Sequence, residues 1–137
     1  MSAGRPAHAP ATPTSISFDV FFSALREPDT AAPVLSARCY AAALNIDLQT
    51  LADQAHVHRH TVTHAPQSAG VQRFLREAVR VIHAATDQSG DVHRALFWYR
   101  NAPLPAFDYQ TAESLVCAGR AEDVVRYVAS LEAGAAG

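Results

Sequence analysis

The sequence contains no lysine, so all 11 basic residues are arginines, and 13 acidic residues leave a formal net charge of −2. This balance gives no overall attraction to a phosphate backbone, so any nucleic-acid binding must come from a local patch. Arginine suits bidentate contacts with carboxylates, phosphates or guanine. The composition therefore excludes nucleic-acid binding through overall charge and leaves a localised interface open.

Cysteine is also scarce, and its two copies, Cys39 and Cys117, lie far apart. They form neither a disulfide scaffold nor a CxxC metal site, and each lies within an apolar helical pattern, so we expect two buried thiols. No stretch approaches the ~18 apolar residues that a membrane helix needs, and the N-terminus lacks the apolar core of a signal peptide. We expect a cytoplasmic protein.

Common catalytic motifs are missing as well. The sequence has no GxSxG or HExxH motif and no glycine-rich phosphate loop, so we expect no enzymatic activity and no cofactor. Apolar residues, in contrast, are plentiful: 49% of the 137 residues are hydrophobic and 18% are charged. A chain of this length and composition buries a core and folds as one compact unit.

Apolar residues recur at helical spacing along most of the chain, which predicts an all-α protein. Residues 1–15 contain three prolines and are expected to form a disordered arm. Residues 17–27 carry phenylalanines at helical spacing, although alternating apolar residues over 16–22 leave a strand open. Further helices are expected at about 36–44, 47–55, 59–65, 68–89, 91–100, 111–119 and 121–134.

The predicted helices form a compact multi-helix bundle in two layers. An N-terminal helical region covers residues 16–86 and a C-terminal helical domain covers residues 89–137. The halves 35–86 and 89–133 are expected to share one core. Polar side chains that suit helix N-termini are expected to cap three of the helices, namely Ser36, Asp47 and Thr111.

The segment 47–65 resembles the helix-turn-helix pair of Xre-type DNA-binding regulators, whose apolar frame is matched here by Leu51, Ala52, Val57, Thr61 and Val62. In such motifs the second helix enters the major groove. The residues on the outward side of that helix would then face bases or phosphates. Those residues are Arg59, His60, Thr63 and His64.

Two departures from that pattern leave a second interpretation open. His56 occupies the turn position where these motifs usually have glycine at positive φ, and Pro66 shortens the second helix. The helix pair is therefore either an operator-binding element or a packing scaffold with a weak or absent DNA role.

The same segment contains a histidine cluster in which His60 and His64 lie one helical turn apart and have the spacing of metal ligands. No nearby cysteine, aspartate or glutamate completes a set of four ligands. We expect exposed histidines and no metal site; the members of the cluster are His56, His58, His60 and His64.

Residues 95–134 resemble the toxin-binding domain of the Xre/MbcA/ParS antitoxin family. The hallmark is a tryptophan before an Asn-x-Pro turn, then a threonine-capped helix with leucine and glycine, then a helix ending in glycine. The loop 106–109 and the pair Thr111-Ala112 depart from the usual double glycine and Thr-Pro. The matching residues are Trp98, Asn101, Pro103, Leu104, Thr111, Leu115, Gly119, Val124 and Gly134.

With the preceding helix pair, the resemblance covers about residues 35–134. It implies a type II antitoxin that packs on a RES-domain toxin, an NAD-degrading enzyme, and blocks entry to its pocket. It also implies a homodimer, a larger toxin–antitoxin complex and possible repression of its own operon. The alternative is an Xre-type transcriptional regulator that has no toxin partner.

The resemblance and the residue types together suggest a toxin-binding surface. Helical spacing places Tyr99 with Val92, Ala95 and Leu96 on the inward face, whereas the interface residue types suggest that Tyr99 or Arg100 reaches outward. We expect the Trp98 ring to fill the core and Asn101 to satisfy a turn backbone. The last helix is expected to stop near Gly134, leaving a slim tail that enters a concave site. The expected contacts are Tyr99, Arg100, Arg120, Arg126, Leu131, Glu132, Gly134 and Gly137.

Overall fold

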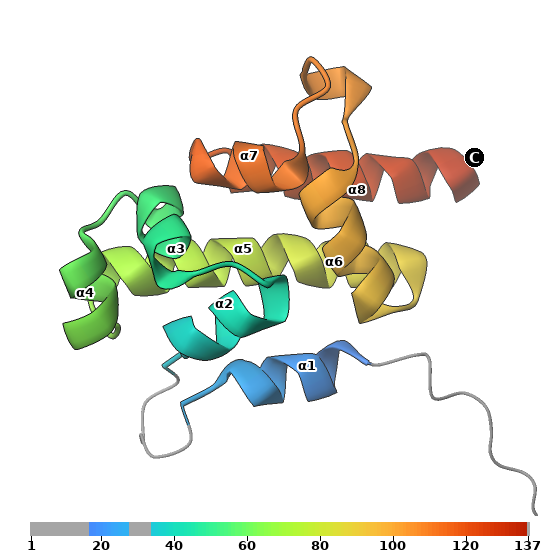
Figure 1. Ribbon diagram of the computed structural model, residues 1–137. Coiled ribbons are helices and arrows are strands. Elements are labelled where there is room, and N and C mark those ends of the chain that lie inside the picture. Colours follow the sequence, from blue (N-terminus) through green and yellow to red (C-terminus); the bar gives the residue numbers. More distant parts are fainter. Residues whose placement is uncertain (1–16, 28–33, 137) are drawn as a thin grey trace, which may run out of the picture.

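The computed structural model describes residues 17–27 and 34–136, most of which are helical (Figure 1). The predicted arm at 1–15 and Gly137 lie outside the described residues. Within those two ranges only isolated β-bridges occur, so the all-α prediction is confirmed and the strand alternative for the first element is wrong. The elements are α1 (Phe18–Leu25), α2 (Ala37–Leu44), α3 (Leu48–Ala55), α4 (Arg59–His64), α5 (Ala69–Ser89), α6 (Val92–Asn101), η2 (Pro105–Phe107), α7 (Ala112–Cys117) and α8 (Ala121–Ala136).

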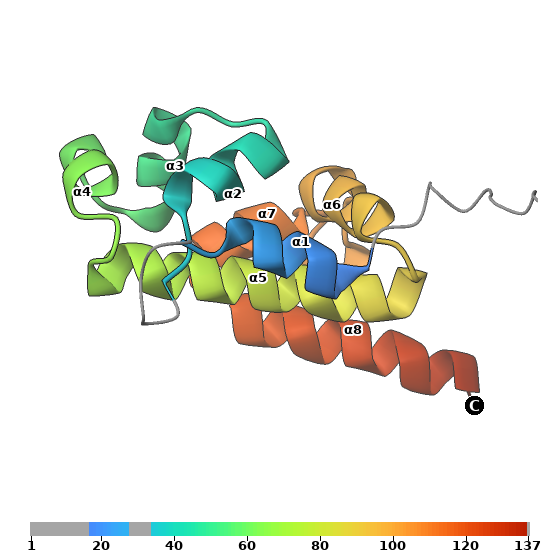
Figure 2. The ribbon, with the colours of Figure 1, turned by 90° about the horizontal axis from the view of Figure 1, so that it is seen from below.

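The helix α5 is the axis of the fold, and its 21 residues make it about 30 Å long. It packs against α1, α2, α3, α6, α7 and α8. Helices α1 and α2 lie on the opposite side of α5 from α7 and α8 (Figure 1), and Figure 2 shows α5 between α8 and the α2–α3 pair. No helix in the described ranges has the length and apolar character of a membrane span.

The predicted capping residues begin the helices as expected. The side chains of Ser36, Asp47 and Thr111 each accept a hydrogen bond from the backbone N–H three residues later, at 3.1, 2.7 and 3.1 Å. These contacts satisfy amides that have no partner within the helix. The hydrogen bond from Thr50 also lowers the pKa of Asp47, because it stabilises the carboxylate.

The core is one continuous cluster that receives buried side chains from every α-helix, so the two predicted halves are not separately packed. Its largest members are Tyr40 on α2 and Tyr99 on α6, which are 1% and 0% exposed. Burial raises the pKa of both phenols well above the usual value. Tyr40 and Tyr99 therefore stay neutral and act as bulky core residues.

Two expectations about local structure are wrong. The helix α8 continues through Gly134 to Ala136, so no slim tail begins at Gly134. Alanines on both sides favour the helix, and one glycine in a helix costs only about 1 kcal/mol. Cys39 is exposed, because the buried face of α2 is made by Ala37, Tyr40, Ala41 and Leu44, and Cys117 is only half-buried.

Candidate functional site

The turn between α3 and α4 contains His56 in the left-handed conformation, with φ of 59°. This geometry matches the positive φ expected at that position, although the residue is not glycine. The His56 Nε2 atom donates a hydrogen bond of 2.7 Å to the backbone carbonyl of Cys117 at the end of α7, which requires the proton to be on Nε2. The histidine therefore ties the helix pair to the C-terminal half.

The helix α4 presents the predicted DNA-contacting residues to solvent. Arg59, His60, Thr63 and His64 are all exposed, whereas Val62 is buried against the core. The helix has only six residues and ends at His64, so it stops before Pro66, as predicted. At about 9 Å, α4 is short for reading a groove, and Arg59 is its single permanent positive charge.

The structure separates the members of the histidine cluster, which do not all face the same place. The rings of His60 and His64 lie together on α4, with centroids 4.3 Å apart, while His56 faces α7. Among the described residues, no group of three histidine, cysteine, aspartate or glutamate side chains is arranged to hold a metal ion.

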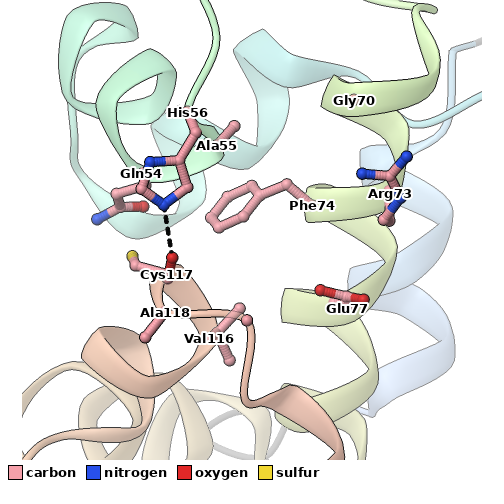
Figure 3. A pocket seen from close by; sticks show the side chains of 11 residues that line it. Gln54, Ala55, His56, Gly70, Arg73, Phe74, Glu77, Val116, Cys117 and Ala118 are labelled. Atoms are coloured by element: carbon pink, nitrogen blue, oxygen red, sulfur yellow. Dashed lines mark hydrogen bonds between the residues drawn. The ribbon is translucent and has the colours of Figure 1, made fainter.

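A pocket of about 320 Å³ opens where α3, α5 and α7 meet (Figure 3). Arg73, Glu77 and His56 supply polar groups to its walls. Cys117 also lines it, and burial raises the pKa of this thiol to about 11. The thiol is therefore protonated at neutral pH, so the pocket is a polar recess without an activated nucleophile.

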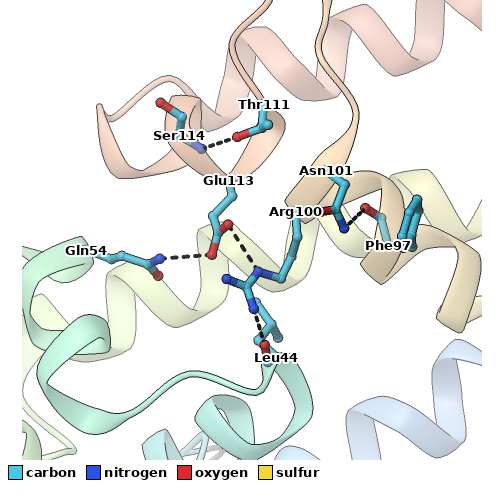
Figure 4. A network of polar contacts seen from close by, with 8 residues as sticks. All are labelled: Leu44, Gln54, Phe97, Arg100, Asn101, Thr111, Glu113 and Ser114. Carbon is cyan, nitrogen blue, oxygen red and sulfur yellow. Dashed lines mark hydrogen bonds and ion pairs between the residues drawn. The ribbon is translucent and has the colours of Figure 1, made fainter.

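A polar network joins the two halves of the chain beside this pocket (Figure 4). Arg100 Nε lies 3.2 Å from Glu113 Oε1, and Gln54 Nε2 donates to Glu113 Oε2 at 2.9 Å. Arg100 also donates to the backbone carbonyl of Leu44. One carboxylate and one guanidinium thus connect α2, α3, α6 and α7.

The structure changes the interpretation of four neighbouring residues at the end of α6. Tyr99 is completely buried, so the expectation that it reaches outward is wrong: it shares the inner face of α6 with Val92 and Ala95. Arg100 points into the network rather than toward a partner. The Trp98 ring is half-buried and packs on the core without being enclosed by it. Asn101 donates to the Phe97 carbonyl within α6 rather than to a turn.

The other predicted toxin-binding residues lie on α8 or just before it. Arg120 pairs with Asp123 at 3.0 Å and lies over the Phe107 ring, and Arg126 pairs with Glu122 and Asp123 at 3.8 and 3.5 Å. Their partners belong to the same chain. Exposed positions near the end of α8 are Leu131, Glu132 and Gly134, while Gly137 lies outside the described residues.

Sequence reasoning did not identify two exposed aromatic side chains, Phe97 (70% exposed) and Tyr109 (68% exposed). Helical spacing contains the signal for Phe97, since it lies two residues from both Ala95 and Tyr99, opposite the buried face of α6. Tyr109 follows η2 with φ of 66°, in the loop that departs from the family pattern. No helical periodicity predicts its orientation.

An apolar cleft of about 210 Å³ lies between the end of α5, α6 and α8. Its apolar wall includes the Trp98 ring, and Leu131 on α8 is 39% exposed at its edge. Arg94 is the one charged residue among those that line it. The lining residues are Ala85, Gln88, Ser89, Arg94, Ala95, Trp98, Val128 and Leu131.

Comparison of the chain with known proteins gives no relative. No family model, no curated protein and no solved structure matches it. The resemblance to the antitoxin family therefore rests on the residues of the sequence itself.

Proposed function

We propose that this protein is the antitoxin of a type II toxin–antitoxin system and neutralises a RES-domain, NAD-degrading toxin by covering its active-site entrance. The observation that carries the proposal is the location of the large apolar side chains that remain exposed. Among the described residues, three of the four large exposed apolar side chains are Phe97, Tyr109 and Leu131. All three lie within 95–134, the segment that resembles a toxin-binding domain, and exposed apolar residues of this kind characterise protein-binding surfaces.

The packing of the C-terminal half supports a role as a rigid plug. Helices α6, α7 and α8 are fixed to α5 by the shared core, and hydrogen bonds of Arg100 with Leu44 and of Glu113 with Gln54 join α6 and α7 to α2 and α3. A surface held in place before binding loses little conformational entropy when a partner docks. Such a surface suits inhibition by shape, in which the partner's own catalytic groups are covered rather than modified.

Expression of the adjacent gene, alone and with this protein, tests the proposal. We expect growth arrest with the adjacent gene alone, restored growth when this protein is present, and co-purification of the two products from the rescued cells. Growth arrest that this protein does not relieve, although both products accumulate, would refute the proposal.

The end of α8 is part of the proposed plug. Residues Leu131 to Gly134 are exposed near the end of α8, and none of them belongs to the buried core. Deleting residues 132–137 is therefore expected to leave the thermal midpoint nearly unchanged and to abolish growth protection. Full protection by the truncated protein, at equal expression, would exclude a role for this end.

A second candidate function, DNA binding, is favoured by the exposed row on α4. Arg59, His60, Thr63 and His64 are exposed and follow a turn in which His56 has a positive φ. Footprinting on the upstream promoter tests this function, with Arg59→Ala expected to weaken protection and Arg38→Ala, an exposed arginine on α2, to leave it unchanged. If the wild-type protein protects no DNA segment in the footprint, the scaffold interpretation is favoured.

A further inference from the structure

We infer that the α6–α8 cleft receives an apolar side chain of the toxin, and that a carboxylate beside that side chain pairs with Arg94. This inference rests on the proposed function and adds to it the surface that holds the partner and the chemistry that the surface recognises.

The outer face of α6 forms one continuous strip that leads into the cleft. Residues three or four positions apart are neighbours on a helix surface, so Phe97 adjoins Arg94, and Arg94 adjoins Trp98. Phe97 and Arg94 are exposed, and Trp98 is half-buried at the cleft wall. Across the cleft, Leu131 comes from the exposed side of α8. Aromatic residues and arginine are the types most often found at the energetic centres of interfaces.

The size of the cleft suits one apolar side chain. A cavity of about 150 Å³ holds a benzene molecule, so about 210 Å³ accommodates a phenyl or leucyl group. The walls near Ala95, Trp98 and Val128 are apolar, and a buried apolar group would displace water from them. A charged side chain at the bottom would instead lose its hydration without a partner.

Charge complementarity identifies the neighbour of that side chain. Arg94 makes no ion pair within the part of the chain that the structure describes, whereas Arg120, just before α8, and Arg126, on α8, each pair with a carboxylate of α8. A guanidinium at the rim of an apolar cleft favours an acidic side chain on the partner and disfavours a basic one. The occupant is therefore an apolar residue with an aspartate or glutamate close to it on the toxin surface.

The single tryptophan gives a direct measurement, because Trp98 lines the cleft. This protein labelled with 5-fluorotryptophan has one fluorine resonance, and the product of the adjacent gene, unlabelled, is added as the probe. We expect the resonance to shift when the complex forms. A complex that forms without any shift would overturn the inference while the proposed function stands. If no complex forms, both are refuted.

Substitutions on the strip test the chemistry. Phe97→Ala and Arg94→Glu are each expected to weaken binding at least tenfold, and Arg38→Glu, a charge reversal at an exposed site on α2, is expected to change it less than twofold. Circular dichroism of each variant checks that the fold is retained. Equal affinities for Arg94→Glu and Arg38→Glu would overturn the inference. So would a fluorine shift that appears on raising the concentration of this protein alone, because the cleft would then take a second copy.

Discussion

Glu113 is the residue whose removal should disturb the junction of the two halves most. Its side chain is 12% exposed and accepts contacts from Arg100 at 3.2 Å and from Gln54 at 2.9 Å. Breaking a buried pair by removing one partner costs about 3–5 kcal/mol, and a surface pair is worth less than about 1 kcal/mol. Arg100 is 34% exposed, so the pair lies between these limits, at roughly 2 kcal/mol. The lost Gln54 contact brings Glu113→Ala to about 3 kcal/mol.

Urea unfolding followed by circular dichroism measures this loss, and the thermal midpoint should fall by roughly 6–12 °C for a chain of this size. The control is Glu122→Ala, which removes the Arg80–Glu122 pair and the longer contact of Glu122 with Arg126, at 3.8 Å, on an exposed surface. That pair is shorter, at 2.7 Å, but its side chains are 53% and 52% exposed, so its loss should cost less than about 1 kcal/mol. Removing both charges in Arg100→Met/Glu113→Leu should recover part of the stability. Equal losses for Glu113→Ala and Glu122→Ala would refute the reasoning.

Three further predictions concern buried and strained side chains. Tyr99→Ala should lower the free energy of unfolding by about 3–5 kcal/mol and Tyr99→Phe by less than about 1 kcal/mol, because the ring fills the core; similar losses in urea titrations would contradict this. His56→Gly should lower the free energy of unfolding by about 1 kcal/mol less than His56→Ala does. Both variants lose the contact with Cys117, but only glycine relieves the left-handed strain. Equal unfolding midpoints for the two variants would contradict this. Cys39 should react with a thiol reagent faster than Cys117. The reaction rate of Cys117 should rise with pH up to about 11, because the thiolate forms over that range. Indistinguishable rates of the two cysteines near pH 8 would be inconsistent with the burial of Cys117.

The secondary structure was predictable because its signals are local. Caps such as Ser36 and Asp47 act within a single turn of chain, and the structure has them where the sequence indicates. The buried stripe of α5 follows directly from its apolar spacing. The single glycine at 134 does not predict the end of α8, because the alanines around it favour continuation of the helix.

The site was harder to predict because side-chain direction depends on which helices meet. Helical spacing separates Tyr99 from Phe97, but it does not show which neighbouring helices bury Tyr99 or what covers the face of α6 that carries Phe97. Arg100 resembles an interface residue in sequence, but its carboxylate partner is 13 positions away, on α7. The α6–α8 cleft joins residues more than 30 positions apart, a distance that periodicity within one helix does not reach.

Inhibition of a partner enzyme by shape alone is the central claim, and NAD consumption measures it most directly. The purified product of the adjacent gene is incubated with NAD while increasing amounts of this protein are added. The account predicts that the rate of NAD loss falls in proportion to the protein added until it stops, and that Phe97→Ala requires a much higher concentration. An undiminished rate of NAD loss in the presence of a saturating amount of the wild-type protein would contradict it.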